Sequence, residues 1–319
     1  MAVSATDLIS IVLCTYNRSQ SLRQTLECLA TQQADGFDYE VVVVDNNSPD
    51  DTKAVVERCQ PLFGGRLRYV FEGRQGKPYA LNTGVAAARG RVLALTDDDV
   101  CPDPRWLCRL AEVFRTSNAE CVFGKILPLW MGARPAWLSA FFLPQLALLD
   151  YGDQAFLVTS DRHLFFGANV ALTKKALARV GPFNVRLGNQ GGRMGGEEDT
   201  DLFERLLAAG ARIAYAPEAV VYHKVPAERL RLGYFRKWHF DHGLVSAYVT
   251  PCTRGRGVLG VPFWAIRKFL THLQGYLIGL CTGDRERRLA NEMRLICDLG
   301  LFVEKGKIAA GRRLACGRS

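Results

Sequence analysis

Three consecutive aspartates, Asp97, Asp98 and Asp99, follow the apolar segment at residues 92–95. Adjacent carboxylates repel one another, so such a run at the end of a buried segment calls for a compensating cation. Hard divalent cations such as Mg²⁺ and Mn²⁺ prefer oxygen ligands, commonly one or two carboxylates together with phosphate oxygens of a substrate. The run therefore indicates a metal site that grips a diphosphate.

Two other interpretations of the run stay open. Carboxylates near a helix N-terminus are stabilised by the positive end of the helix dipole, and Pro104 predicts a helix start nearby, which explains one acid better than three. A phosphatase of the haloacid dehalogenase type also places Asp-x-Asp after a buried strand. That pattern requires Thr or Val two residues after the second acid, where Cys101 stands here.

A second acidic cluster lies in GGEEDTDLFERL, where Glu197, Glu198, Asp199 and Asp201 precede a predicted amphipathic helix. Dipole compensation accounts for one or two of these acids. A carboxylate that takes a proton from an attacking hydroxyl would account for another. His223 ends the apolar segment AVVYH, where an imidazole is either a buried structural residue or a ligand suited to Mn²⁺.

Short apolar segments that alternate with helical ones position these side chains. The predicted strands cover residues 8–17, 39–45, 67–72 and 91–97, and the predicted helices cover residues 21–33, 51–60, 78–90 and 104–117. This alternation predicts parallel βαβ units with both sheet faces covered. Ligands bind such sheets at the carboxyl ends of the strands, where CTYNR, DNNSPDD and TDDD would meet. Residues 212–224 predict two short strands with a turn at Pro217.

Five segments together resemble the family 2 glycosyltransferases, in that family's order and approximate spacing. They are SIVLCTYNR, VVVVDNNSPDDT, LALTDDDVCPDPRWL, FFGANVALTKKALARVGPFN and GGEEDTDLFERLLAAGARIAYAPEAVVYH. The resemblance implies an α/β fold of the GT-A type, a Rossmann-like mixed sheet flanked by helices. It implies a catalytic domain over residues 1–225, after which we expect residues 226–319 to form a basic, partly amphipathic helical extension. The implied reaction is inverting transfer of a sugar from a nucleoside-diphospho-sugar to an acceptor hydroxyl.

The resemblance also assigns residues to roles. The catalytic base would be Asp199, with Glu198 the next candidate. The donor would be contacted by Thr15, Asn17, Asp45, Lys77, Asn82, Asp97 and Asp98. The cofactor, Mn²⁺ or Mg²⁺, would be bound by Asp99, Asp97 and His223. The acceptor would be contacted by Asn169 and Arg205.

Some of these assignments have simpler alternatives in the residues themselves. Asp45 can form an Asx turn or a helix cap, and Lys77 can be a solvated loop lysine. Arg205 lies one helical turn after Asp201 and can simply pair with it. The glycines of the preceding loop would let that loop close over donor and acceptor; they are Gly191, Gly192, Gly195 and Gly196.

Composition sets the remaining expectations. The 319 residues carry a net charge of +9, and residues 251–319 alone hold 13 Lys and Arg against 5 Asp and Glu, a net charge of +8. This basic region includes an uncharged segment at 269–283 that is short for a membrane span, which favours an in-plane amphipathic helix on an anionic membrane or a helix packed on the protein. The 10 cysteines form no CxxC pair, so we expect reduced core thiols, a strand rather than a signal peptide at the N-terminus, and a cytoplasmic protein, peripheral at the membrane.

The expected partners are a nucleotide-sugar donor, with UDP favoured, and a saccharide or lipid-linked acceptor. No nucleic-acid partner is expected. The products would be cell-surface polysaccharide or glycolipid. There are two alternatives. One is a sugar-nucleotide pyrophosphorylase-like enzyme, which would have a glycine- and arginine-rich loop after the first strand; the segment CTYNRSQ at this place does not match that pattern. The other is a catalytically inactive, membrane-associated assembly partner.

Overall fold

The computed structural model describes residues 8–188, 196–258 apart from 250–256, and 260–316. The chain divides into two compact units. We call the first the sheet unit; it comprises Met1–Met131, Ala147–Gly191 and Glu198–Val225. We call the second the helical unit; it comprises Gly132–Leu146, Gly192–Glu197 and Pro226–Ser319. Each is described below by itself.

Four parallel strands form one half of the sheet, as the sequence predicts. They are β1 (Leu8–Thr15), β2 (Asp38–Asp45), β3 (Leu67–Phe71) and β4 (Val92–Asp97). Their order is β3-β2-β1-β4, and Thr15 pairs with Asp45 while Cys14 pairs with Asp97. The polar residues that end these strands therefore come to one edge, as expected for parallel strands.

The other half of the sheet is mixed. It contains β5 (Val100–Pro102), β6 (Cys121–Trp130), β7 (Phe156–Leu157), β8 (Val170–Thr173) and β9 (Ile213–Val225). β8 is antiparallel to β4 and β6, β9 is parallel to β6, and β5 and β7 are antiparallel to β9. The prediction of two short strands around Pro217 is wrong. One strand continues through this region, because β6 and β9 resume pairing after a register shift between Gly124 and Ile126.

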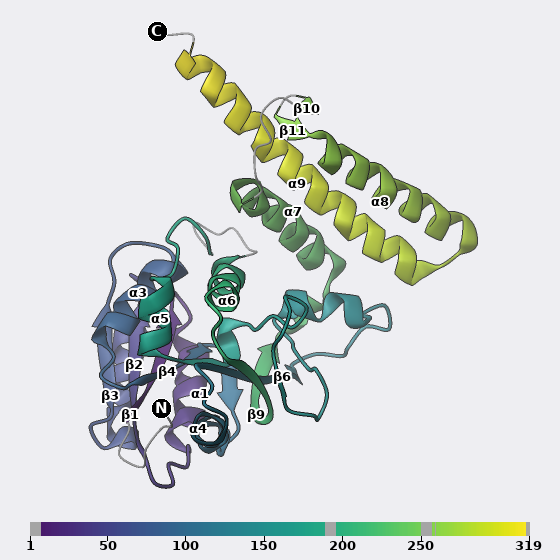
Figure 1. Ribbon diagram of the computed structural model, residues 1–319. Coiled ribbons are helices and arrows are strands. Elements are labelled where there is room, and N and C mark those ends of the chain that lie inside the picture. The colour runs from purple at the N-terminus through teal and green to yellow at the C-terminus, as the bar shows by residue number, and fades with distance from the viewer. Residues whose placement is uncertain (1–7, 189–195, 250–256, 259, 317–319) are drawn as a thin grey trace. The chain divides into compact units, whose positions relative to one another are not determined.

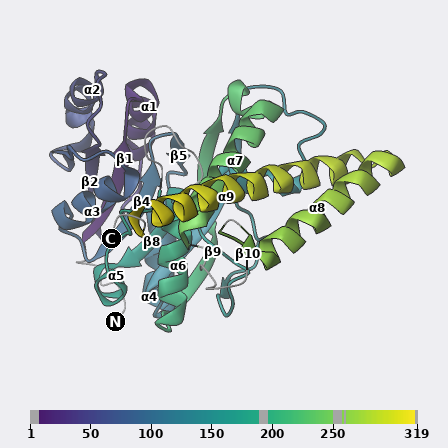
Figure 2. The same cartoon turned by 90° about the horizontal axis from the view of Figure 1, so that it is seen from above.

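Helices lie on both faces of this sheet (Figures 1 and 2). They are α1 (Ser19–Ala30), α2 (Thr52–Cys59), α3 (Lys77–Ala87), α4 (Trp106–Ser117), α5 (Lys174–Val180) and α6 (Glu198–Ala208), with 3₁₀ turns η1 (Gln60–Phe63) and η4 (Gly167–Asn169). β2 reads as a continuous apolar segment because both its faces are covered, and Val41 to Val44 have no exposed surface.

The helical unit contains α7 (Leu232–Val249), α8 (Phe263–Thr282) and α9 (Arg285–Cys316), the 3₁₀ turns η2 (Ala140–Phe142), η3 (Pro144–Leu146) and η5 (Ala227–Leu230), and the strands β10 (Gly257–Val258) and β11 (Val261–Pro262). α8 and α9 lie side by side as a hairpin (Figures 1 and 2). Gly279 permits this close packing, since a Cβ there would lie 2.7 Å from the backbone nitrogen of Arg288. Among the described helices, none has the length and apolar character needed to cross a membrane.

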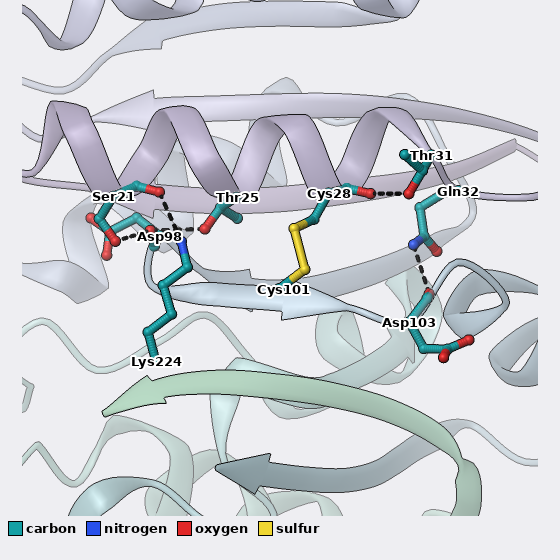
Figure 3. Close-up of a disulfide and its surroundings, with 9 residues drawn as sticks. All are labelled: Ser21, Thr25, Cys28, Thr31, Gln32, Asp98, Cys101, Asp103 and Lys224. Carbon is teal, nitrogen blue, oxygen red and sulfur yellow. Dashed lines mark hydrogen bonds between the residues drawn. A yellow bond between two sulfur atoms is a disulfide. The ribbon is translucent and has the colours of Figure 1, made fainter. Parts of the chain in front are cut away.

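A disulfide joins Cys28 of α1 to Cys101 of β5 (Figure 3). The expectation that the cysteines are all reduced is therefore wrong for this pair. The two residues are 73 positions apart, but α1 packs beside β5 and brings their Cα atoms to 5.4 Å. Among the free thiols, Cys281 is exposed, so the expectation of core positions is also wrong for this residue.

Candidate donor and metal site

The three aspartates occupy the sharp connection between β4 and β5. Asp97 ends β4, and β5 begins at Val100, which pairs with His223 of β9. This antiparallel register places Asp99 against His223, with 3.1 Å between the Asp99 Oδ1 and His223 Nε2 atoms. The backbone amide of Lys224 also donates to the Asp99 carbonyl at 2.9 Å. A short strand that the sequence does not reveal thus brings together the predicted metal ligands Asp99 and His223.

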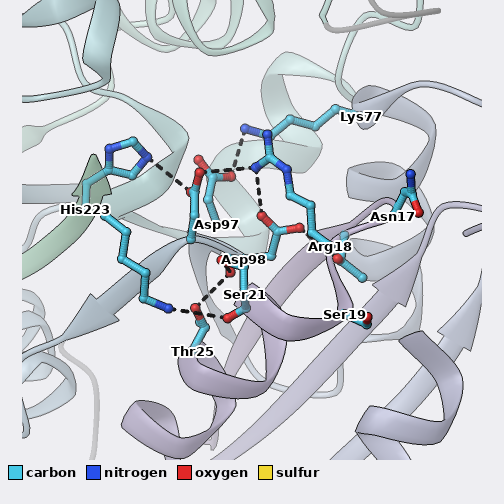
Figure 4. Close-up of polar contacts among 12 residues, drawn as sticks. Asn17, Arg18, Ser19, Ser21, Thr25, Lys77, Asp97, Asp98 and His223 are labelled. Atoms are coloured by element: carbon cyan, nitrogen blue, oxygen red, sulfur yellow. Dashed lines mark hydrogen bonds and ion pairs between the residues drawn. The ribbon is translucent and has the colours of Figure 1, made fainter. Parts of the chain in front are cut away.

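Asp98 is held from the opposite side by the end of β1 and the start of α1. Thr15 donates its hydroxyl to Asp98 Oδ2 at 2.7 Å, and Arg18 Nη1 lies 3.1 Å from both Asp98 Oδ1 and Asp99 Oδ2 (Figure 4). Ser21 and Thr25 donate to the Asp98 carbonyl, each at 2.9 Å. Burial raises the pKa of Asp98 to about 6; Arg18 opposes this rise and Asp99 adds to it. Asp98 and Asp99 together form a buried acidic pair whose oxygens are hydrogen-bonded by the surrounding side chains.

Lys77 links Asp97 to the second acidic cluster. Its Nζ lies 2.9 Å from Asp97 Oδ1 and 3.6 Å from Glu198 Oε1, so it is no solvated loop lysine. Burial disfavours the charged amine, but Asp97, Asp199 and Glu198 outweigh it and raise the pKa of Lys77 well above its ordinary value. Glu198 is only 3% exposed, and its Oε2 finds no hydrogen-bond partner among the described residues. Such an unpaired buried oxygen is costly unless a ligand uses it.

Asp199 lies at the start of α6 and accepts a hydrogen bond at Oδ2 from the Gly167 amide of η4, at 2.8 Å. Gly167 permits the approach, because a Cβ there would lie 2.7 Å from Asp199 Oδ1. Burial raises the pKa of Asp199 to about 7, Glu198 adds to the rise, and Lys77 opposes it. A carboxyl that titrates near neutral pH can both hold and release a proton there.

The remaining predicted donor contacts lie near this edge in different states. Asp45 accepts from the Ser48 amide at 2.9 Å and from the Tyr69 hydroxyl at 2.8 Å, which is the turn geometry that its sequence left open. Asn17 is exposed, with φ at 53°. Asn82 exchanges two hydrogen bonds of 2.9 Å with the backbone of Phe183, so it clasps the segment after α5 rather than facing the acids.

The two predicted acceptor contacts have partners within the sheet unit. Asn169 is 1% exposed, accepts from Trp106 Nε1 and donates to two backbone carbonyls, so its amide is fully used in the core. Arg205 pairs with Asp201 at 2.7 Å and donates to the carbonyls of Val180 and Gly181 at the end of α5. The structure brings neither side chain to Asp97 or Asp98. Of the glycines predicted to form a gate, all but Gly196 lie outside the described residues.

Arg18 is the site residue that sequence reasoning missed. It ends the segment CTYNR, whose polar character indicates only the end of a strand. A cation at the carboxyl end of a strand neighbouring three aspartates is a signal of charge pairing, but only the register of β1 against β4 shows that the two ends meet.

The donor atoms at this edge fit a divalent cation. Asp99 supplies a carboxylate and His223 an imidazole that is 4% exposed, whose Nδ1 finds no partner among the described residues. Two protein ligands of this kind suit Mn²⁺ when substrate phosphates complete the shell. Within the described part of the chain, no three Asp, Glu, His or Cys side chains are arranged to hold a metal by themselves.

Comparison with known proteins gives this geometry its context. Residues 10–181 match the family model described as Glycosyl transferase family 2. The chain is 32% identical over 238 residues to the succinoglycan biosynthesis protein ExoM of Rhizobium meliloti (strain 1021), covering 74% of this chain and 72% of that protein. It is 28% identical over 253 residues to the chondroitin synthase of Escherichia coli, covering 69% of this chain and 35% of that protein.

Solved structures share the fold. The mannosyltransferase PcManGT from Pyrobaculum calidifontis, in complex with GDP-Man and Mn²⁺, aligns with a TM-score of 0.55 and 18% identity over 98% of this chain and 77% of its own. S. aureus TarS 1–349 in complex with UDP aligns with a TM-score of 0.53 and 18% identity over 90% of both chains. The mixed sheet flanked by helices is thus the GT-A fold. The chain belongs to glycosyl transferase family 2 and is a glycosyltransferase, as its motifs predict.

Proposed function

We propose that this glycosyltransferase moves a sugar from a nucleoside-diphospho-sugar to an acceptor hydroxyl with inversion at the anomeric carbon, and that Asp199 is its base. The observation that carries the proposal is Asp199 itself, a half-buried carboxyl with a pKa raised to about 7 in the same group of charges as Lys77, Asp97 and Glu198. Inversion requires a base that removes the proton of the attacking hydroxyl, and a carboxylate that titrates near neutral pH suits this role.

The other charges serve the donor. Asp99, Asp97 and His223 would hold Mn²⁺ or Mg²⁺, which, when bound, stabilises the departing diphosphate as a Lewis acid. Lys77 lies between Asp97 and Glu198, where its ammonium adds positive charge beside the proposed diphosphate position. Asp97 and Asp98 remain proposed donor contacts, together with Thr15, Asn17, Asp45 and Asn82. The acceptor roles of Asn169 and Arg205 become indirect, through the core and α5.

The names of similar proteins support a proposal for the product and for the donor nucleotide. ExoM and chondroitin synthase are named for polysaccharides, which supports assembly of a cell-surface polysaccharide or glycolipid. TarS binds UDP and PcManGT binds GDP-Man, and we favour a UDP-sugar. A thermal-shift screen of UDP- and GDP-sugars with and without Mn²⁺ tests this, because a ligand stabilises the folded state that binds it. With the donor known, NMR of the product distinguishes inversion from retention, and a retained anomer would reject the proposed mechanism.

We also propose that the helical unit attaches the enzyme to the cytoplasmic face of an anionic membrane. α8 exposes large apolar side chains together with Arg267 and Lys268; the apolar ones are Phe263, Trp264, Leu270, Leu277 and Leu280. An amphipathic helix with exposed aromatic and basic residues suits an interfacial position. Co-sedimentation with vesicles of phosphatidylglycerol, compared with phosphatidylcholine alone, tests this attachment, and equal absence of binding to both would reject it.

A further inference from the structure

The partly exposed side chain of Arg18 contacts both Asp98 and Asp99. It follows Asn17, whose φ is 53°, and it precedes the first turn of α1. Its Nη1 contacts Asp98 Oδ1 and Asp99 Oδ2, while Thr15 and His223 take the other oxygen of each carboxylate. Each of the four carboxylate oxygens therefore has a partner, and Arg18 is the partner shared by both acids.

A divalent cation bound by Asp99 would compete with Arg18 for this carboxylate, whereas His223 is itself a proposed ligand and would stay beside the metal. The two side chains differ in their freedom to move. The His223 side chain is 4% exposed on β9, whereas that of Arg18 is 48% exposed at the end of a loop. Arg18 would also be repelled by the incoming cation. The side chain that can leave at least cost is therefore Arg18.

A displaced guanidinium needs a new anion, and the donor brings one. Guanidinium groups bind phosphate through two parallel hydrogen bonds, which suits Arg better than Lys for this purpose. Lys77 differs because its side chain is only 22% exposed and Glu198, which is not a proposed metal ligand, pairs with it as well as Asp97, so Lys77 keeps an anionic partner when the metal binds.

We propose that Arg18 is an exchangeable counter-ion: it neutralises Asp98 and Asp99 as long as no cation binds them, and transfers to the donor diphosphate when the metal and the nucleotide bind together. This inference rests on the proposed function and extends it. Free Mn²⁺ must displace Arg18 without offering it a partner, whereas Mn²⁺ with a nucleoside diphosphate does offer one. The metal and the nucleotide should therefore bind with positive coupling that depends on Arg18.

The test measures Mn²⁺ binding by electron paramagnetic resonance, and nucleotide binding by calorimetry, with UDP and GDP as probes. In Arg18→Gln, Mn²⁺ alone should bind about 5- to 20-fold more tightly than in the wild type, and the enhancement of Mn²⁺ binding by the nucleotide should fall by a similar factor. The Mn²⁺ affinity and the coupling of Arg18→Lys should lie between those of the wild type and Arg18→Gln, because lysine keeps the positive charge but cannot form two parallel hydrogen bonds to phosphate.

Arg179→Gln is the matched control. Arg179 also pairs with a carboxylate, that of Glu120 at 2.7 Å, but neither residue is among the proposed ligands of the metal or the donor. It should leave both affinities unchanged. If Arg18→Gln lowers stability by loosening the loop, addition of Mn²⁺ alone should still raise its melting temperature more than it raises that of the wild type. Unchanged or weaker binding of Mn²⁺ alone by Arg18→Gln overturns the proposal. Failure of the wild type to bind any nucleotide with Mn²⁺ would instead contradict the proposed function.

Discussion

The strand edge of the sheet unit and the α8 helix of the helical unit depart from ordinary burial in opposite directions. The strand edge buries charge: four ionisable residues there are at most 8% exposed, namely Asp98, Asp99, Glu198 and His223. α8 exposes apolar surface, with Leu270 at 57%. Folded proteins normally do the reverse, and each exception carries a free-energy penalty that folding alone does not explain. The comparison suggests chemistry at the first region and attachment at the second.

The largest effect should come from removing the proposed base. Asp199→Asn keeps the size and the hydrogen bond from Gly167 but cannot accept the hydroxyl proton, so kcat should fall about 10²- to 10⁴-fold. Binding of the donor with Mn²⁺ should remain, since Asp199 is not among its proposed ligands. Steady-state kinetics with the donor found in the thermal-shift screen measures the first, and calorimetry measures the second.

Asp201→Asn is the control for this substitution, two positions along the same helix. Asp201 pairs with Arg205 and lies outside the group around Lys77, so its loss should lower kcat less than tenfold. Retained transfer by Asp199→Asn would move the base to Glu198. Equal loss in both variants would mean that the start of α6 matters for structure and not for proton transfer.

The next effect concerns what holds the buried charges in place. The double substitution Cys28→Ser and Cys101→Ser opens the link between α1 and β5, and should lower the free energy of unfolding by about 2–4 kcal/mol. Because Ser21 and Thr25 of α1 hold the Asp98 carbonyl, affinity for Mn²⁺ with nucleotide should fall as well. Chemical denaturation and calorimetry measure the two.

Cys108→Ser is the matched control, a free thiol on α4 of the same unit. It should change the free energy of unfolding by less than about 1 kcal/mol. If the double serine variant is as stable as this control, the disulfide contributes nothing to the strand edge.

These two regions also differ in how far the sequence predicts them. The aspartates are found because a buried strand followed by charges is a local signal, and the Arg205–Asp201 pair because helical spacing fixes which side chains meet. The Cys28–Cys101 link, the contact of Arg18 with Asp98, and the pairing of β5 with β9 each join segments far apart in the chain. Their partners depend on sheet register, which no local pattern reveals.

The helical unit shows the converse case. The apolar and basic residues of α8 predict an amphipathic helix, since its periodicity is local, and a helix does form over Phe263–Thr282. At Asn169, by contrast, the family resemblance locates the segment without fixing what the side chain does. Its position in the motif suggests the acceptor, whereas its amide bonds Trp106 and two carbonyls in the core. Only the fold distinguishes a polar residue that packs from one that binds.

A smaller effect is expected for attachment. Leu270→Asp with Leu277→Asp places two charges on the exposed face of α8 and should weaken binding to phosphatidylglycerol vesicles about tenfold or more. Transfer to a water-soluble acceptor should stay within twofold, because the change leaves the strand edge intact. Co-sedimentation and an assay without vesicles measure the two effects.

Leu62→Asp is the control, because Leu62 is similarly exposed, at 52%, on η1 of the sheet unit. It should leave vesicle binding unchanged. If the α8 variant binds vesicles as tightly as the wild type, the exposed apolar surface of α8 does not attach the protein to a membrane.

The smallest effect tests whether the Asp199 carboxyl lowers the stability of the folded protein at neutral pH. The pKa of Asp199 is about 7 in the folded protein, against 3.8 for the unperturbed group. The folded state therefore keeps a proton that the unfolded state releases, and stability falls as pH rises from about 4 to about 7. Asp199→Asn removes this dependence. The melting temperature of the variant minus that of the wild type should become more positive by about 2–4 °C between pH 5 and pH 8.

Asp201→Asn is the control, because Asp201 pairs with Arg205 and lies outside the group around Lys77, so its melting temperature relative to the wild type should change less between these pH values than that of Asp199→Asn. A difference between Asp199→Asn and the wild type that stays flat with pH would mean that the Asp199 carboxyl ionises as easily in the fold as in water. It would then have no special claim to the base. A difference that grows with pH means that the protein keeps a carboxyl which destabilises it at neutral pH. Since asparagine fills the same space without this penalty, the reason for aspartate must lie in the proton that it can take up.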